Sequence, residues 1–294
     1  QGKVLGIVGE SGSGKSVTAK SIMQLNPGNT IYNDNAEIII DDENILKFTS
    51  KNDLKKIRGG KVSMIFQEPM ASFAPAIKIG NQMVEQLLLH KDLDKHKAKS
   101  ISIDMLNRVG IADAEKRFNQ YAFELSGGMR QRAMIAMALS TMPKLLLADE
   151  PTTALDVTIQ AQVINLMKDI IKEFNMGVIF ITHDLGVIAQ VADDVAVMYL
   201  GSVVERGPVN EILKNPKHPY TKGLLNALPD INNLDAPLKP IPGNIPSPLE
   251  RPTGCVFRTR CPNPTHDCKE GNIEMGLIEV EPGHWVDQCC VNCG

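Results

Sequence analysis

The chain has 294 residues, of which 43% are apolar and 22% are charged, a balance typical of a packed globular protein and not of a disordered chain. Its net charge of −3 gives no basic field for nucleic acid, and no apolar run approaches the roughly 20 residues of a membrane-spanning helix. All six cysteines lie within residues 255–293, which excludes a disulfide scaffold distributed through the chain.

Strand-like and helix-like segments alternate through the first part of the chain. Continuous apolar runs at residues 4–8, 145–148 and 178–181 predict strands of a parallel sheet that is buried on both faces. A helix is predicted over residues 16–25, directly after the first strand, and residues 195–204 predict a hairpin. The alternation predicts an α/β fold that is built from right-handed βαβ units.

The texture of the sequence changes twice. Helical spacing and strong helix formers at residues 82–90, 97–109 and 130–139 predict a helical subdomain over about residues 79–138, inserted into the α/β body. After residue 228 prolines become frequent, which predicts a loop-rich extension with little regular structure. We therefore expect an α/β domain over residues 1–228 and an extension over residues 229–294.

A glycine-rich segment at residues 9–16 follows the first strand and matches the pattern GxxxxGK[ST], which binds phosphate in this strand–loop–helix context. Its backbone N–H groups and the helix N-terminus favour phosphate oxygens, so the alternative of a plain flexible loop is much less probable. Lys15 is expected to neutralise the β- and γ-phosphates and to assist catalysis, and the Ser16 hydroxyl to bind Mg²⁺. The predicted nucleotide-binding residues are Gly9, Ser11, Gly12, Ser13, Gly14, Lys15, Ser16 and Val17.

Further polar residues end the predicted strands. Asp149 and Glu150 close the run 145–148, where Asp149 is expected to hold Mg²⁺ and Glu150 to orient and polarise the attacking water. His183 follows the run 178–181, and Gln67 follows another apolar run. Taken alone, the acidic pair is consistent with a surface turn and the other two with ordinary polar residues, so their weight comes from their order relative to the glycine-rich loop.

Ser126, Gly127 and Gly128 precede a predicted helix and form a second anion-ready helix start. In this order the motifs resemble those of the nucleotide-binding subunits of ABC transporters over about residues 1–220. The resemblance identifies residues 9–16 as Walker A, Gln67 as the Q-loop glutamine and residues 145–150 as Walker B. It further identifies residues 125–131 as the signature, Asp156 as the D-loop aspartate and His183 as the switch histidine.

The resemblance implies a composite site in which two ATPase subunits pack head to tail. The signature residues Ser126, Gly127, Gly128 and Gln131 would then contact the ATP of the partner. The catalytic residues Glu150, Gln67, His183 and Lys15 would act on the chain's own ATP, with Mg²⁺ held by Ser16, Gln67 and Asp149. ATP hydrolysis would drive separate membrane subunits through a rigid-body switch.

A finer resemblance is to the ATPases of oligopeptide and dipeptide importers, carried by "IRGGKVSMIFQEPM", "ELSGGMRQRAMIAMAL" and "NPKHPYTKGLLNALP". It implies three kinds of partner: two membrane permeases, an extracytoplasmic solute-binding protein and a second, different ATPase. The chain itself would lie on the cytoplasmic face of a bacterial or archaeal membrane, and no nucleic acid is expected as a partner. Nickel or another small solute remains an alternative cargo. The family has a strand pair and an adenine-stacking aromatic residue upstream of Walker A, so we expect the chain to be N-terminally truncated and to bind ATP less tightly.

Two other functions are less consistent with the motifs. DNA-repair ATPases of this class carry long coiled-coil arms between Walker A and the signature, and residues 16–125 contain no sustained heptads. A non-catalytic half of an asymmetric ATPase pair often lacks the acid after Walker B or the Ser-Gly-Gly sequence, and both are intact here. We therefore expect an active ATPase.

The clustered cysteines predict a separate metal or cluster site in the extension. Thiols in a cytosolic chain favour a metal or cluster over disulfides, and Cys255, Cys261 and Cys268 lack the close CxxC spacing of structural zinc sites. The importer resemblance implies a [4Fe–4S] cluster on Cys255, Cys261, Cys268 and either Cys289 or Cys290. Zinc and uncoordinated reduced thiols remain alternatives. We expect catalysis to be supplied by the cysteine-free body without this extension.

Overall fold

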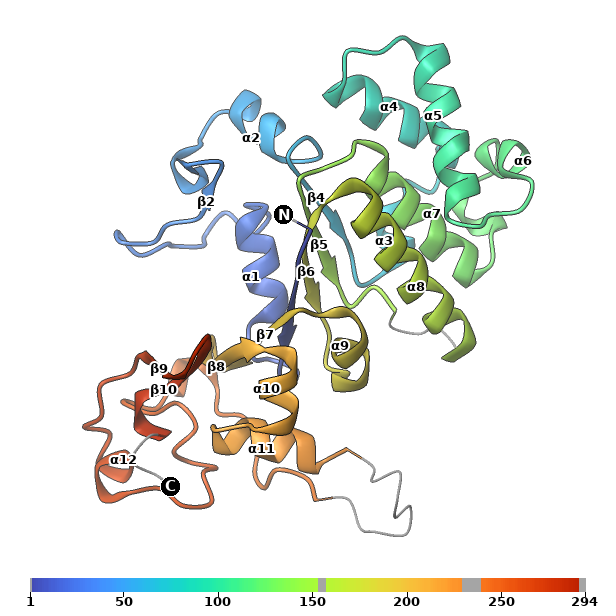
Figure 1. Ribbon diagram of the computed structural model, residues 1–294. Helices are drawn as coiled ribbons and strands as arrows, with labels where there is room; N and C mark the ends of the chain where they lie inside the picture. The colour runs from blue at the N-terminus through green and yellow to red at the C-terminus, as the bar shows by residue number, and fades with distance from the viewer. Residues whose placement is uncertain (1, 153–156, 229–238, 291–294) are drawn as a thin grey trace. The chain divides into compact units, whose positions relative to one another are not determined.

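The computed structural model describes residues 2–152, 157–228 and 239–290 (Figure 1). The chain divides into two compact units, the first with residues 1–3 and 17–179 and the second with residues 4–16 and 180–294. Asp156 of the predicted D-loop and Cys293 lie outside the described residues. Among the described helices, none combines the length and apolar character needed to cross a membrane.

The first unit contains the parallel strands that end in the predicted catalytic residues. Strand β4 (Val62–Ile65) pairs in parallel with β5 (Leu145–Asp149), and β6 (Gly177–Ile181), which runs on into the second unit, follows β5 in the sheet. All four residues of β4 are buried, and three of them are apolar, which is typical of a strand that is covered on both faces. A small antiparallel pair, β2 (Ile39–Ile40) with β3 (Glu43–Asn44), was not predicted.

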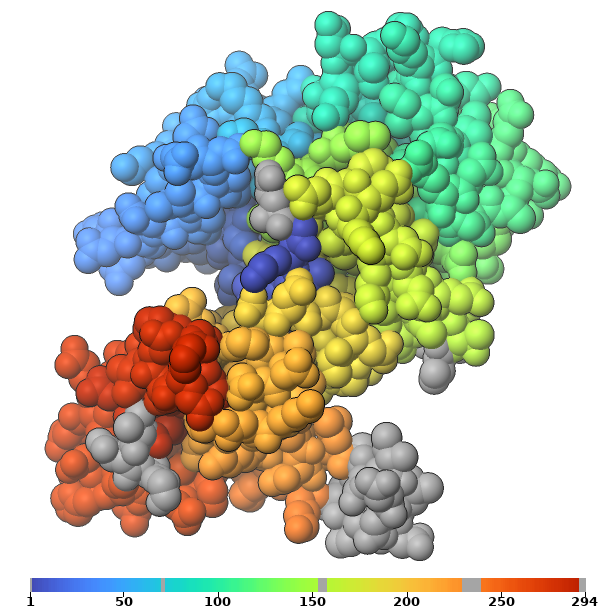
Figure 2. All heavy atoms as spheres, in the orientation of Figure 1, coloured from blue at the N-terminus to red at the C-terminus, as the bar shows by residue number. Residues whose placement is uncertain are grey.

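Helices α4 to α7 lie in the part of the chain for which a helical subdomain is predicted, and in Figure 2 the blue-green atoms of α4, α5 and α6 form one contiguous lobe of the first unit. Helices α4, α5 and α7 pack against one another, which confirms the helices predicted from spacing. Side-chain caps set two of their starts, because Asp94 accepts a hydrogen bond from the Lys97 N–H and Ser126 accepts one from the Met129 N–H. The helices of the first unit are α1 (Lys15–Ile22), which begins in the second unit, α2 (Lys51–Ile57), α3 (Pro69–Ser72), α4 (Ile79–His90), α5 (Lys95–Arg108), α6 (Ala114–Phe118), α7 (Gly127–Ser140) and α8 (Val157–Phe174).

The second unit is built on a mixed sheet. Its strands lie in the order β1 (Val4–Val8), β7 (Asp194–Tyr199), β8 (Ser202–Pro208), β10 (His284–Asp287) and β9 (Leu277–Glu281). Strand β1 pairs in parallel with β7, whereas the remaining pairs are antiparallel. The β7–β8 hairpin confirms the sequence prediction.

Strands β9 and β10 correct the expectation that the C-terminal extension has little regular structure. They are four or five residues long and join the hairpin edge through the pairs Trp285–Arg206 and Val286–Glu205. Segments this short give a weak periodic signal, and the pairing partner on β8 is distant in sequence. The sheet therefore continues into a region in which we predicted loops.

An aromatic core holds this continuation against the rest of the second unit. The ring of Tyr199, at the end of β7, meets the Tyr220 ring at 4.7 Å and the Phe257 ring at 5.2 Å, both edge to face. All three side chains are fully buried, and such pairs contribute beyond the area they bury. The helices of this unit are α9 (Leu185–Val191), α10 (Val209–Lys214), α11 (Pro219–Asn226) and α12 (His266–Glu270).

Candidate functional site

The glycine-rich loop of residues 9–16 joins β1 to α1 and is held against the β7–β8 turn. Gly12 and Gly14 have φ values of +84° and +102°, which only glycine adopts without strain. A Cβ atom at Gly9 would collide with the backbone oxygen of Met198. The Gly201 N–H of the turn donates to the Ser13 carbonyl at 2.8 Å. The glycines therefore allow a close approach that side chains would prevent.

Lys15 is folded back over its own loop. Its ammonium donates to the carbonyl oxygens of Gly9 at 2.7 Å and Glu10 at 3.0 Å, and the residue is 6% exposed. These are bonds that a phosphate group can replace, since phosphate offers stronger charge-assisted acceptors. The predicted ligands at the start of α1 are more open, because Ser16 is half-buried and Val17 is exposed.

Two of the predicted catalytic residues lie together in the first unit. The Gln67 side-chain amide, just after β4, donates to the Glu150 carboxylate at 3.1 Å. Asp149 is buried at the end of β5, and Glu150 follows it with a φ of +47°, a conformation that costs energy in a residue with a side chain. Such strain is found where the surrounding structure holds a side chain in place for a function.

The Ser-Gly-Gly sequence forms the exposed start of α7. Ser126 and Gly127 are exposed, and the Ser126 hydroxyl accepts the Met129 N–H at 3.3 Å. Gln131 behaves differently from the expectation that it faces a partner's nucleotide. It is 1% exposed and its amide donates to the Pro151 carbonyl, so it links the signature helix to the turn after Glu150.

His183 lies in the bend between β6 and α9, within the second unit. The residue is exposed, and the helix that follows it is capped by Asp184, whose carboxylate accepts the N–H groups of Gly186 and Val187. Thr182, just before His183, is buried. The bend thus presents the imidazole at the carboxyl end of a strand, as the sequence order predicts.

The thiols of the C-terminal extension gather, and most of them are buried. Cys255 and Cys289 share a hydrogen bond, and the Sγ atoms of Cys289 and Cys290 are 3.5 Å apart. The hydrogen bond with Cys289, followed by burial, raises the pKa of the Cys255 thiol. Burial, with Cys255 and Cys268 close enough to add to it, raises the pKa of Cys261. Neighbouring thiols cannot all ionise without a cation, which is the condition that a metal or a cluster satisfies.

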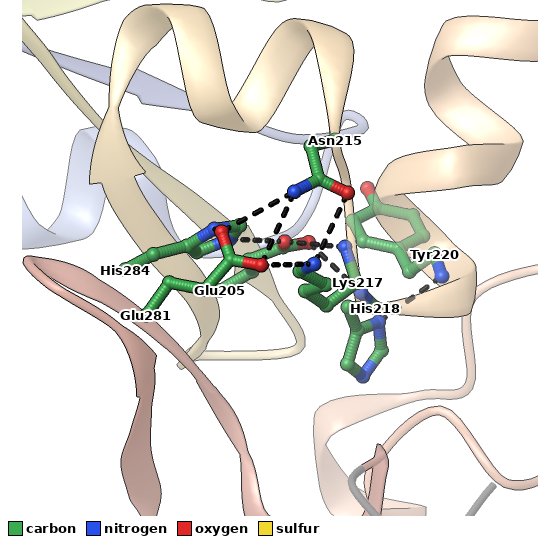
Figure 3. Close-up of polar contacts among 7 residues, drawn as sticks. All are labelled: Glu205, Asn215, Lys217, His218, Tyr220, Glu281 and His284. Atoms are coloured by element: carbon green, nitrogen blue, oxygen red, sulfur yellow. Dashed lines mark hydrogen bonds and ion pairs between the residues drawn. The ribbon is translucent and has the colours of Figure 1, made fainter. Parts of the chain in front are cut away.

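A buried polar network supports the segment between β8 and α11 (Figure 3). The fully buried Glu205 carboxylate accepts the N–H groups of Lys217 at 2.7 Å and His218 at 3.0 Å, and it pairs with His284 Nε2 at 2.8 Å. The His218 Nδ1 atom in turn accepts the Tyr220 N–H at 3.0 Å, and burial lowers the pKa of His218 to about 3. His218 is therefore neutral, and the network fixes the start of α11.

At the edge of this network a partly exposed ion pair links two distant segments. The Lys217 ammonium lies 2.7 Å from the Glu281 carboxylate, which also accepts from the Asn215 amide. The hydrogen bond from Lys217 holds the pKa of Glu281 below its usual value. No sequence pattern predicted this network, because its partners are distant in the chain, although the segment "NPKHPYTK" within it carries the family resemblance.

The chain matches the family described as "ABC transporter" over residues 1–153 and that described as "Oligopeptide/dipeptide transporter, C-terminal region" over residues 204–268. The chain therefore belongs to the ABC transporter family, whose ATP-binding subunits hydrolyse ATP. The second match begins within β8, before the boundary at residue 228 that we expected. We refer to residues 204–268 as the C-terminal region.

Relatives narrow the family to the ATP-binding proteins of oligopeptide and dipeptide transport. The chain is 50% identical to the oligopeptide transport ATP-binding protein AppD of Bacillus subtilis over 270 residues, 91% of this chain and 81% of AppD. It is 46% identical to the dipeptide transport ATP-binding protein DppD of Bacillus subtilis over 295 residues, 100% of this chain and 85% of DppD.

Solved structures agree with this fold. The dimeric ATP-binding cassette MJ0796 bound to ADP and Pi is 26% identical, with a TM-score of 0.62 over 71% of this chain and 86% of that one. The cbiO1 protein from Clostridium perfringens is 26% identical, with a TM-score of 0.61 over 73% of this chain and 80% of that one.

Proposed function

We propose that this chain binds Mg²⁺–ATP on the loop of residues 9–16 and hydrolyses it to drive peptide import. Lys15 leaves the carbonyls of its own loop and neutralises the phosphates, while Ser16 and Asp149 supply oxygen ligands for Mg²⁺. Glu150 orients the attacking water, Gln67 holds Glu150 in position, and His183 contacts the transferred phosphoryl group. The observation that carries this proposal is the bond from Gln67 to the strained Glu150.

We propose peptides as the cargo, because both named Bacillus relatives are transport proteins for peptides and match most of this chain. The partners proposed are a second ATPase that shares the composite site, two permeases and an extracytoplasmic solute-binding protein, which puts the chain on the cytoplasmic face of the membrane. Ser126, Gly127 and Gly128 then serve the nucleotide of the second ATPase, a role that the exposure of Ser126 and Gly127 supports.

An apolar cavity of the first unit supports permease docking. Its volume is about 160 Å³, and its lining is mainly of apolar side chains from β4, the segment that follows it and α7, including Met64, Phe66, Met134, Met137 and Ala138. Phe66, beside Gln67, is partly exposed. A short helix of a permease would bury this surface, and its movement would reach Gln67 directly.

We also propose that Cys255, Cys261, Cys268 and Cys289 hold a [4Fe–4S] cluster. Cys255, Cys268 and Cys289 are buried, and Cys261 lies near both Cys255 and Cys268, which fits a thiolate-bound group. The bond between Cys255 and Cys289 favours Cys289 over Cys290 as the fourth ligand. Such a group would link the turns that contain Cys255 and Cys261 to α12 and to the segment after β10. Brown protein with iron and sulfide after anaerobic purification supports the cluster, and colourless protein with stoichiometric zinc contradicts it.

The experiment that tests peptide import is ATP turnover by the complete transporter in proteoliposomes. We expect turnover to rise when the solute-binding protein is loaded with short peptides and to stay at its basal rate with nickel. The variant Glu150→Gln provides the control for contaminating ATPases. Stimulation by nickel and not by peptides would overturn the proposed cargo, and equal turnover of the Glu150→Gln transporter would overturn the proposed catalytic role.

A further inference from the structure

A buried arginine of the C-terminal region binds a carboxylate of the phosphate-binding loop. The Arg260 guanidinium, only 4% exposed, donates to both oxygens of Glu10, at 2.8 and 3.1 Å. Its Nε–H donates to the Pro242 carbonyl at 2.9 Å, and Nη2 also donates to the Ile241 carbonyl at 3.3 Å. This two-pronged geometry is the strongest form of the arginine–carboxylate pair, and it fixes the guanidinium on all sides.

A tyrosine of the same region holds the backbone of the same loop residue. The Glu10 N–H donates to the Tyr220 hydroxyl at 2.8 Å, so Glu10 is held by its main chain as well as its side chain. Tyr220 is fully buried, and burial raises the pKa of its hydroxyl, which stays protonated. The position of Tyr220 is set by His218 and Glu205 in the network of Figure 3.

The same aromatic core connects these two contacts. Arg260 lies over the Tyr199 ring, with 5.8 Å from its guanidinium carbon to the ring centroid, and Tyr199 packs on Tyr220 and Phe257. Tyr199 also leads into the β7–β8 turn, where the Gly201 N–H binds the Ser13 carbonyl. The loop is therefore held at Glu10 and at Ser13 by one continuous packed structure.

We propose that the C-terminal region positions the phosphate-binding loop for ATP, with Arg260 and Tyr220 as positioning residues that act through Glu10. The inference rests on the proposed ATP binding and adds a role for residues 204–268, which the transporter family match leaves without one. Arg260 keeps the charge of Glu10 paired within the phosphate-binding loop. Without Arg260 an unpaired carboxylate would remain in a loop that must bind an anion.

The test is a double-mutant cycle on Mg²⁺–ATP binding by the whole chain, measured by calorimetry. We expect Arg260→Ala to weaken binding about tenfold, the cost of one charge-assisted pair. In a Glu10→Gln background, where no charge needs pairing, we expect Arg260→Ala to add no more than about twofold. Arg260→Lys keeps the charge and loses the two-pronged hydrogen bonding, so its affinity for Mg²⁺–ATP should lie between those of the wild type and Arg260→Ala. The matched control is Arg206→Ala, whose guanidinium lies over the Trp285 ring.

Each outcome of this cycle has a distinct meaning. Equal losses from Arg260→Ala in both backgrounds, or wild-type affinity in the Arg260→Ala variant, would overturn the inference and leave ATP binding itself intact. Failure of the unmodified chain to bind ATP would overturn the proposed function instead. If Arg260→Ala does not fold, the comparison of Arg260→Lys in the two backgrounds decides, because coupling through Glu10 predicts a loss in one and none in the other.

Discussion

The chain has two glycine-rich turns that open helices, and they differ in how they are held. The loop of residues 9–16 is buttressed by Gly201, Tyr220 and Arg260, with Lys15 folded over it. In the turn at residues 126–128, Ser126 and Gly127 are exposed and Gly128 is half-buried, and the Ser126 hydroxyl caps the helix that follows. Both offer N–H groups to an anion, so their chemistry alone does not separate them.

The difference follows from the task proposed for each turn. A loop that binds the chain's own nucleotide gains affinity when it is organised in advance, because less ordering is required on binding. A turn that must meet the nucleotide of another subunit has to stay accessible until the subunits close. Helix capping by Ser126 is sufficient to keep that turn formed while leaving its surface open.

The largest expected effect is on stability, at Glu205 in the network that positions Tyr220 beside the phosphate-binding loop. Glu205→Ala would leave two buried N–H groups and His284 without their acceptor, so we expect the second unit to lose about 3 kcal/mol of stability. Trp285 is the only tryptophan of the chain and follows His284, so its fluorescence during urea unfolding reports on this region. Glu250→Ala, at an exposed position, is the control, and equal midpoints for the two variants would contradict the buttress.

A smaller effect is expected at the open turn. Ser126→Ala should leave ATP binding by the isolated chain within about twofold of wild type and lower turnover of the assembled transporter about tenfold. Removal of a cap costs about 1 kcal/mol, so Ser50→Ala, which removes the equivalent cap of α2, is the matched control. A loss of ATP affinity in the isolated chain after Ser126→Ala would remove the distinction between the two turns.

The smallest effect concerns a single neutral hydrogen bond. Tyr220→Phe removes the acceptor of the Glu10 N–H, and we expect ATP affinity to fall about threefold, in line with about 0.7 kcal/mol for such a bond. Tyr32→Phe removes a comparable bond from the Asn26 amide in the first unit and should leave affinity unchanged. Calorimetry on the two variants compares them directly, and equal affinities would show that the arginine pair alone holds the loop.

Local patterns predicted the strands and helices around the glycine-rich loop and in the helical segment, but not β2, β3, β9 or β10. Strand β1, the glycine-rich loop and the start of α1 follow one another directly in the chain. A short motif is therefore sufficient to predict how they are arranged. The β7–β8 hairpin was predictable for the same reason. Contacts between distant segments gave no such signal, because Glu10 and Arg260 are separated by 250 positions in the chain.

The C-terminal region was predicted least well. Its prolines and cysteines predicted a loop-rich extension with a metal or cluster site that is separate from the ATP site. Arg260 stands between two of those cysteines, yet its guanidinium serves the phosphate-binding loop. The phosphate-binding loop and the extension are therefore in direct contact. Gln131 was expected from the family resemblance to contact a partner's nucleotide, and in this chain it is buried against Pro151.

The most direct test of the account is ATP hydrolysis by the assembled transporter with Glu150→Gln in this chain. The substitution preserves the shape of the side chain and the contact with Gln67, and it removes the charge that polarises water. We predict that ATP binding stays within about twofold of wild type while turnover falls at least about a hundredfold. Turnover at the wild-type rate would contradict the assignment of catalysis to this residue.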